Sequence, residues 1–222
     1  MLNLKSSLRN RIPHGLYSAL RLLRNEVNIY RLHRKGIKKA RTYAGQSDMK
    51  LNIGCGPNRK QGWINIDLLP DVDLSLDMRE AMPFSENSAT IIYSEHFFEH
   101  LDYPEPAKRF LKECHRILKP GGIFSVGVPD TEWPLQAYVG PDDKNYFAWS
   151  KVNCLPEWCQ TRIDDINYHF RQDGEHRFAY DYETLHHALM EAGFSNIRQR
   201  AFDAGLDTES RRIGTLYVDA VK

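Results

Sequence analysis

The sequence predicts an α/β domain built on a doubly wound, mostly parallel sheet of seven strands. Short apolar runs alternate with helical stretches from residue 48 to residue 222, which is the pattern of parallel β–α units. A Gly-X-Gly turn at Gly54–Gly56 follows the first apolar run, as it does in nucleotide-binding domains of this kind. The 222 residues are 41% hydrophobic and 27% charged, an ordinary composition for one domain that buries a full core.

The composition excludes several classes of protein. The chain is too apolar for a disordered protein and has no collagen repeat. Its four cysteines form no CxxC pair, so we expect free thiols and neither a disulfide framework nor a zinc site. No apolar run approaches the roughly 18 residues of a membrane span. We therefore expect a soluble, cytoplasmic protein. The cysteines are Cys55, Cys114, Cys154 and Cys159.

Residues 1–47 form a basic extension ahead of the domain at 48–222. Residues 1–41 hold eleven Lys or Arg and one acid, a net charge of +10, whereas the rest of the chain carries −9. Apolar residues at helical spacing predict an amphipathic helix there, with most arginines off the apolar stripe. Pro13 suits the first turn of this helix. The stripe consists of Leu16, Leu20, Leu23, Val27 and Tyr30.

Four interpretations of this extension stay open. The stripe packs on the domain and leaves the arginines as a solvated face. Alternatively, the helix lies on an anionic membrane and places the protein at the inner membrane surface. A third interpretation is binding of a polyanionic substrate or nucleic acid, and a fourth is an organellar transit peptide. The sequence does not choose among them.

Two helices and seven strands are expected in the domain. The helices are 106–118 and 182–192, the second ended by Gly193 as its C-cap. The interval between Gly56 and Asp67 is short, so we expect a turn where the first helix of such a fold would lie. The expected strands are 50–53, 63–68, 72–76, 90–93, 123–128, 197–201 and 215–221.

Residues 131–175 show no clear periodicity and are rich in aromatic side chains, among them Trp133, Trp149 and Trp158. A long insertion after a strand of such a sheet is usually functional. We therefore expect an aromatic cap over a substrate site.

The glycine turn and the acids after it predict a cofactor site. Gly54 and Gly56 permit a tight turn and the close approach of a ligand to the backbone. The next strand ends in Asp67, whose carboxylate can accept hydrogen bonds from two ribose hydroxyls. Asp77 follows the third strand, where a carboxylate can accept a hydrogen bond from the adenine amine. Without Asp67 the glycines alone would indicate only a strand and a turn.

Taken in order, these segments resemble the class I S-adenosylmethionine (SAM)-dependent methyltransferases. The similarity is greatest to a small bacterial group of predicted SAM-dependent methyltransferases, many of them associated with polysaccharide or glycan synthesis. The loop departs from the family pattern at Asn52, where many members have an acid, and at Pro57-Asn58, which replace a third glycine. The segments that carry the resemblance, over roughly residues 50–222, are LNIGCGPN, GWINIDLL, the MPF segment, IIYSEHFFEHL, RFLKECHRILKPGGIFSVGVPD and HRFAYDYETLHHALMEAGF.

The resemblance implies a methyltransferase that acts on a hydroxyl of a small-molecule or glycan-linked acceptor. It assigns the glycine loop to the methionine part of SAM, Asp67 to the ribose, and Asp77 with Met78 to the adenine edge. Ser94, Glu95 and His96 would line the methyl-donor site. The expected cofactor-binding residues are Asn52, Gly54, Cys55, Gly56, Asp67, Leu68, Asp77, Met78 and Ser94.

Methyl transfer to a hydroxyl needs alignment of the reacting atoms and a base that takes the proton. We expect the catalytic groups among His96, Glu95 and His176, and a purely local role for either imidazole stays open. His96 and His100 have the spacing of a metal-binding pair, but no third ligand is evident, so we expect no metal. The expected substrate-binding residues are Asp130, His169 and Arg177.

Three other functions compete with this one. A nucleotide-binding oxidoreductase shares the glycine turn and Asp67 but does not account for the SEHFFEHL segment. A nucleic-acid methyltransferase would use the basic extension, but the fourth strand lacks the proline–aromatic tetrad of amino-methylating DNA enzymes. We therefore expect no specific nucleic-acid partner. A non-catalytic SAM-binding scaffold also stays open, as does membrane-surface or polyanion contact through the N-terminal helix.

Overall fold

The computed structural model describes residues 12–222, and its centre is one seven-stranded sheet. The strands are β1 (Met49–Ile53), β2 (Ile64–Asp67), β3 (Leu74–Ser75), β4 (Ala89–Glu95), β5 (Leu118–Pro129), β6 (Ser195–Arg200) and β7 (Thr215–Val221). They lie in the order β3-β2-β1-β4-β5-β7-β6. The first five are parallel, and β7 runs antiparallel to both β5 and β6. The predicted α/β fold with a mostly parallel sheet is confirmed.

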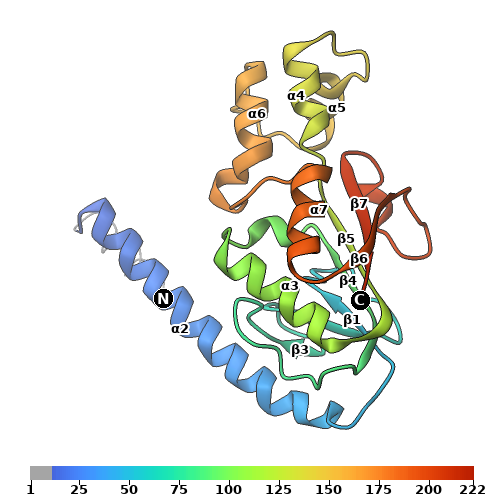
Figure 1. Cartoon of the computed structure of the whole chain (residues 1–222). Helices are drawn as coiled ribbons and strands as arrows, with labels where there is room; N and C mark the ends of the chain where they lie inside the picture. The colour runs from blue at the N-terminus through green and yellow to red at the C-terminus, as the bar shows by residue number, and fades with distance from the viewer. Residues whose placement is uncertain (1–11) are drawn as a thin grey trace.

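Six helices and four short 3-10 helices complete the described chain. The helices are α2 (His14–Ala40), α3 (Glu105–Ile117), α4 (Glu132–Val139), α5 (Tyr146–Asn153), α6 (Arg162–Arg171) and α7 (Tyr182–Glu191). The 3-10 helices are η1 (Arg41–Tyr43), η2 (Phe98–His100), η3 (Gln172–Gly174) and η4 (Glu209–Arg211). The segment between β1 and β2 is a turn without a helix. Helices α4, α5 and α6 fill residues 131–175 and stand together beyond one end of the sheet (Figure 1).

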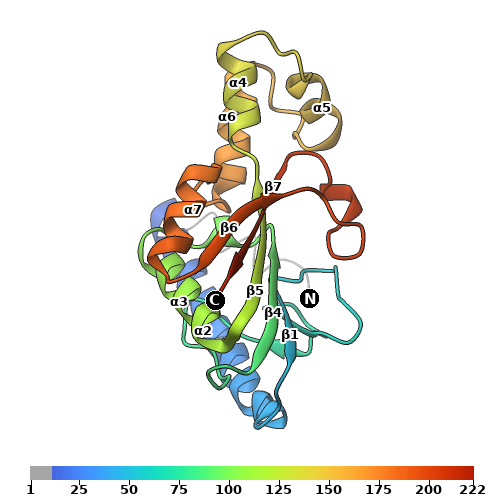
Figure 2. The same cartoon turned by 45° about the vertical axis from the view of Figure 1, so that its right-hand side comes forward.

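Helices α3 and α7 cover one face of the sheet (Figures 1 and 2). In α3 the fully buried residues Ala107, Phe110, Leu111 and Cys114 follow helical spacing, so one stripe faces the core. Phe124 of β5 continues this core, because its ring lies 6.1 Å from that of Phe110. The amphipathic pattern that predicts α3 from sequence is therefore the pattern that attaches it to the sheet.

Two loops cover β4 on the opposite face, where a doubly wound fold commonly has helices (Figure 2). Trp63, from the turn before β2, lies with its ring centroid 6.5 Å from that of Tyr93. Lys60, from the same turn, places Nζ 4.5 Å from the Tyr93 ring centroid and donates to the carbonyl of Leu206. The Tyr93 hydroxyl donates to Asp207 at 3.0 Å, so the segment before β7 is held over the same strand.

Helix α2 begins directly after Pro13 and packs on the domain only through its second half. Gly36 lies against β3 so closely that a Cβ atom there would be 2.1 Å from the carbonyl oxygen of Ser75. The predicted apolar stripe is elsewhere: Leu16, Leu23 and Tyr30 are 54%, 62% and 62% exposed. The interpretation that this stripe packs on the domain is therefore wrong.

Part of the basic extension lies outside the described residues, namely Lys5, Arg9 and Arg11. Within residues 12–222 no helix is long and apolar enough to cross a membrane.

Candidate cofactor and acceptor site

The glycine turn lies at the point in the sheet where the strand order reverses. Strands β1 and β4 are neighbours, with β2 and β3 on one side and β5 on the other. Gly54 follows β1, Asp67 ends β2 and Ser94 lies near the end of β4. Ligands of open α/β sheets bind at this place, beyond the carboxyl ends of the strands.

Both glycines of the turn adopt positive φ, 65° at Gly54 and 50° at Gly56. Gly54 also touches Phe97, because a Cβ atom at residue 54 would be 2.4 Å from the Phe97 Cβ. Apart from the neighbouring residues of the chain, no heavy atom of residues 12–222 lies within 4 Å of the corresponding position at Gly56. The turn is therefore closely packed against Phe97 at Gly54 and open at Gly56, which leaves room for a ligand beside Gly56.

Asp67 and Asn52 hold the turn in place. The Gly56 N–H donates to Asp67 Oδ2 at 2.9 Å, and the Leu68 N–H donates to Asp67 Oδ1 at 2.6 Å. The buried Asn52 side chain donates to the carbonyl of Asn58 at 3.0 Å. Burial raises the pKa of Cys55 to about 11, so its thiol stays protonated and serves packing.

At the end of β3, Asp77 is bound by residues of the chain itself. Arg79 Nε lies 3.0 Å from Asp77 Oδ1, and Arg79 Nη2 lies 2.7 Å from Glu26 of α2. Burial alone would raise the pKa of Asp77, but the hydrogen bonds from Arg79 lower it below its usual value. The Asp77 N–H also donates to His33 Nδ1 at 3.1 Å. Helix α2 is thereby joined to the strand end where the adenine is expected, next to the buried Met78.

Ser94 offers an independent test of the cofactor. Its side chain is fully buried, and its Oγ has no hydrogen-bond partner in the described part of the chain. Buried hydroxyls are normally hydrogen-bonded. An unpartnered hydroxyl beside an open glycine turn fits a polar ligand such as SAM.

The expected catalytic role of Glu95 is wrong, because its carboxylate is occupied by structural contacts. Oε1 accepts hydrogen bonds from the Tyr217 hydroxyl and the Thr208 N–H, each at 3.1 Å. Oε2 lies 3.3 Å from Arg211. With both oxygens engaged, Glu95 is a positioning residue that holds the segment before β7, and it is not available as a base.

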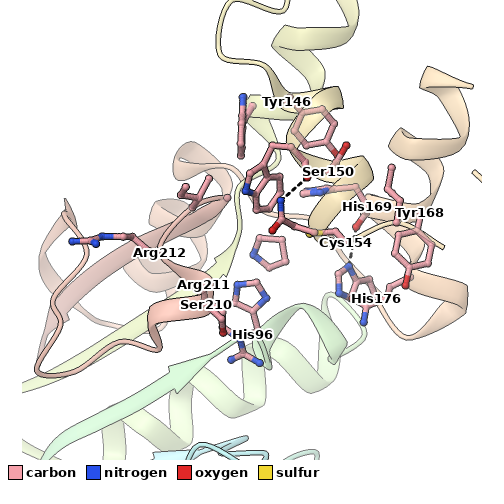
Figure 3. Close-up of a pocket in the computed structure, with 18 of the residues that line it drawn as sticks. His96, Tyr146, Ser150, Cys154, Tyr168, His169, His176, Ser210, Arg211 and Arg212 are labelled. Atoms are coloured by element: carbon pink, nitrogen blue, oxygen red, sulfur yellow. Dashed lines mark hydrogen bonds between the residues drawn. The ribbon is translucent and has the colours of Figure 1, made fainter. Parts of the chain in front are cut away.

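A cavity of about 570 Å³ lies between the three helices of the cap, the ends of β4 and β5, and residues 209–214. Figure 3 shows Tyr168 and His169 on one side of it and Ser210 and Arg211 on the other, with His96 close to Arg211. Its lining includes Trp133, Tyr146, Trp149, Asn153, Gln172 and His176.

His96 stands where the chain leaves β4 and enters this cavity. It has φ of 52°, a strained value for a residue with a side chain. Its N–H donates to the carbonyl of Gly127 at 2.8 Å, and its Nε2 lies 2.8 Å from Thr215 Oγ1. Burial, with the nearby Arg211 guanidinium, lowers the pKa of His96 to about 3. The imidazole is therefore neutral at pH 7.

His169 and His176 enter the cavity from the cap side. His176 Nδ1 lies 2.9 Å from the carbonyl oxygen of His169 (Figure 3). His169 Nε2 is buried without a partner among residues 12–222, and burial lowers the pKa of His169 to about 4. Both imidazoles therefore line the cavity, and that of His169 is neutral at pH 7.

Substrate binding was also expected of Asp130 and Arg177, but neither residue lines this cavity. Asp130 Oδ1 accepts the N–H of Glu132 at 3.0 Å and so caps the start of α4. Arg177 is exposed, and its contribution is its backbone N–H, which donates to the carbonyl of Glu99 at 2.8 Å.

Arg211, Ser210 and Asn153 line the cavity but are not among the site residues expected from the sequence. No motif marks them, because they belong to a loop and a helix that meet His96 only in the folded chain. Aromatic enrichment was the one usable signal, and it pointed to Trp133 and Trp149.

Comparison with known proteins agrees with the cofactor site. Residues 68–126 match a family described as "Methyltransferase domain". A 53-residue segment is 42% identical to malonyl-[acyl-carrier protein] O-methyltransferase 1 of Coxiella burnetii. This match covers 23% of the present chain and 18% of that protein, so the chain spans less than a fifth of the relative's length.

Two solved structures illustrate how far the likeness extends. A SAM-dependent methyltransferase from Archaeoglobus fulgidus is 18% identical, with 84% of this chain and 92% of that chain covered and a TM-score of 0.49. A possible histamine N-methyltransferase from Thermotoga maritima is 15% identical, with coverage of 94% and 99% and a TM-score of 0.47. The strand order and the open glycine turn agree with the match of residues 68–126 to this methyltransferase-domain family.

Proposed function

We propose that the protein transfers the methyl group of SAM to a hydroxyl of a small-molecule or glycan-linked acceptor bound in the cavity. One observation carries this proposal: the cavity includes His96, the residue directly after β4. The cavity therefore opens at the same edge of the sheet as the glycine turn. In-line transfer requires the acceptor and the methyl donor to approach each other at such a junction.

The lining of the cavity suits a polar ring compound. Flat faces of Trp133, Trp149 and Tyr168 can stack on a sugar or another ring. Asn153 and Ser210 add hydrogen-bonding groups beside them. A volume of about 570 Å³ lies within the range of about 300–1,000 Å³ that is usual for small-molecule sites.

The residues of the chain have separate tasks in this reaction. Bound SAM supplies an activated methyl group, so the protein mainly has to align the acceptor and take its proton. Gly54, Gly56 and Asp67 would hold the cofactor. We assign proton acceptance to His169, because its Nε2 is the cavity-lining imidazole nitrogen that is buried and free of partners in the described structure.

A carboxylate acceptor is the second candidate. Arg211 and Arg212 both line the cavity and could hold an anion. The Coxiella burnetii relative is named as an O-methyltransferase of a malonyl group, which has a carboxylate oxygen to methylate. The two candidates differ in the acceptor and share the cofactor site.

The first experiment is calorimetric titration of the purified protein with S-adenosylhomocysteine (SAH), with NAD as the control ligand. We expect saturable binding of SAH alone. A panel of hydroxylated sugars and carboxylic acids, assayed with labelled SAM, then separates the two acceptor classes. Binding of NAD in place of SAH would overturn the proposal in favour of an oxidoreductase.

We also propose that the outer half of α2 contacts an anionic membrane surface. Its exposed stripe of Leu16, Leu20, Leu23 and Val27 is flanked by Arg21 and Arg24. Such a helix lies flat at a lipid interface, where acidic headgroups complement the arginines. A second copy of the helix fits less well, because α2 is strongly basic and would repel itself.

A further inference from the structure

We propose that Glu99, His100 and His176 bind a divalent transition-metal ion beside the acceptor cavity. Metal binding stands on the geometry alone. The role of the ion in catalysis rests on the proposed function.

The first observation is that the Glu99 carboxylate is buried and unpartnered. Its side chain is 2% exposed, and neither oxygen has a hydrogen-bond partner within residues 12–222. Burying a carboxylate without a partner costs several kcal/mol, on the order of the penalty for an isolated buried ion. A proton or a cation bound at this carboxylate would remove that cost.

The second observation is that three imidazole nitrogens converge on one oxygen of Glu99. His96 Nδ1, His100 Nε2 and His176 Nε2 lie 3.8, 3.9 and 4.0 Å from Oε1. These separations are too long for hydrogen bonds. The ligand atoms of Glu99, His100 and His176 all lie within 4.8 Å of one another. An ion bound at about 2.0–2.2 Å holds neighbouring ligand atoms roughly 3.3 Å apart, so these three atoms need to move inward by about half an ångström.

The third observation concerns the protonation of two of these imidazoles. His100 Nδ1 lies 3.0 Å from the carbonyl of Glu175, and His176 Nδ1 lies 2.9 Å from the carbonyl of His169. A carbonyl oxygen only accepts, so each Nδ1 carries the hydrogen and each Nε2 presents a lone pair to Glu99. Metal-binding histidines are oriented in this way by a second contact to a carbonyl.

The chain assembles this cluster from two distant segments. Glu99 and His100 lie in η2, which is anchored by the fully buried Phe98. The N–H groups of Arg177 and Phe178 both donate to the carbonyl of Glu99, at 2.8 and 3.2 Å. This docking brings His176 to the carboxylate, and it explains why no third ligand was evident from the sequence.

The ligand set selects the class of metal. Imidazole nitrogens with one carboxylate suit Zn²⁺, Fe²⁺, Co²⁺ or Ni²⁺ better than Mg²⁺ or Ca²⁺, which prefer oxygen. His176 also lines the acceptor cavity, so the open coordination position would face the acceptor. An ion there can bind an acceptor hydroxyl and ease loss of its proton.

Metal titration of the full chain tests the site directly. The purified protein is stripped with a chelator and dialysed against Zn²⁺, Co²⁺ or Mg²⁺, and bound metal is measured by elemental analysis. We expect about one equivalent of Zn²⁺ or Co²⁺ and no Mg²⁺. A wild-type protein that retains no Zn²⁺ or Co²⁺ would overturn the proposal.

Variants separate this site from adventitious binding. Glu99→Gln keeps the side-chain shape, and His176→Asn removes a ligand from the second segment. We expect each to weaken Zn²⁺ binding by at least about 100-fold. His187→Ala is the matched control, because His187 and Glu191 form an exposed pair 3.6 Å apart. Unchanged binding in Glu99→Gln, or equal loss in His187→Ala, would place the metal elsewhere.

Titration with SAH, run in parallel, confirms that each variant is folded and keeps the two proposals distinguishable. Binding of SAH without Zn²⁺ or Co²⁺ would overturn the metal site and leave the methyltransferase proposal intact. Binding of Zn²⁺ without binding of SAH would overturn the methyltransferase proposal and leave the metal site intact.

Discussion

Gly54→Ala and Gly56→Ala add the same methyl group at two positions of one turn with different surroundings. Each places a side chain at positive φ, which costs about 1–2 kcal/mol. At residue 54 the new Cβ would also lie 2.4 Å from Cβ and Cγ of Phe97. Phe97 packs against Phe110, with ring centroids 5.6 Å apart, so its displacement adds about 1–3 kcal/mol.

The two variants should therefore fail in different ways. We expect Gly54→Ala to lose about 2–5 kcal/mol of unfolding free energy and Gly56→Ala about 1–2 kcal/mol. Gly56→Ala should instead weaken SAH binding, because its methyl group projects into the space left for the cofactor. Urea denaturation and calorimetry measure the two effects. Equal stabilities would refute the described contact with Phe97, and unchanged SAH affinity in Gly56→Ala would refute the position of the cofactor.

The remaining predictions concern the base, a buried ion pair and the N-terminal helix. His169→Asn should lower kcat by about 10²–10⁴-fold without changing SAH affinity; wild-type turnover would exclude it as the base. Arg200→Met should lower the free energy of unfolding by about 3–5 kcal/mol, because it leaves the fully buried Asp207 carboxylate without its arginine partner. Exposed Arg212→Met should lower it by under about 1 kcal/mol. Equal losses of stability in the two variants would contradict a stabilising role of the buried ion pair. Burial opposes ionisation of Asp207, but hydrogen bonds from Arg200 lower its pKa below the usual value. The stabilisation by the Arg200–Asp207 pair is therefore complete above about pH 4 and is lost as the pH falls through the folded-state pKa of Asp207. The melting temperature of Arg200→Met should therefore depend less on acid pH than that of the wild type. Leu23→Asp should reduce sedimentation with anionic vesicles; undiminished binding, or preference for RNA over vesicles, would reject membrane contact.

The fold was predictable because its signals are local. The apolar runs that predict β1 and β4 are the strands buried at the centre of the sheet. Strand β5 begins five residues earlier than expected, since Leu118 already pairs with Ala89. Its Pro120 and Gly121 indicate a turn when the sequence is considered alone, and only pairing with a neighbouring strand reveals the longer element.

The site was less predictable, because it depends on contacts between distant segments. Glu95 and Glu99 are four residues apart and equally acidic in sequence. Tyr217 and Arg211, from the end of the chain, occupy the first carboxylate, whereas the second is left without a partner in the described structure. Nothing near either residue encodes that difference.

The contacts from Glu26 through Arg79 to Asp77 have a thermodynamic consequence. They join a helix of 27 residues, about 40 Å long, to the strand end beside the cofactor turn. Coupling between two binding sites is reciprocal, so each ligand changes the affinity for the other by the same factor. Whatever free energy a surface contact on α2 transmits through these residues must therefore reappear, with equal size and sign, in the affinity of the protein for SAM.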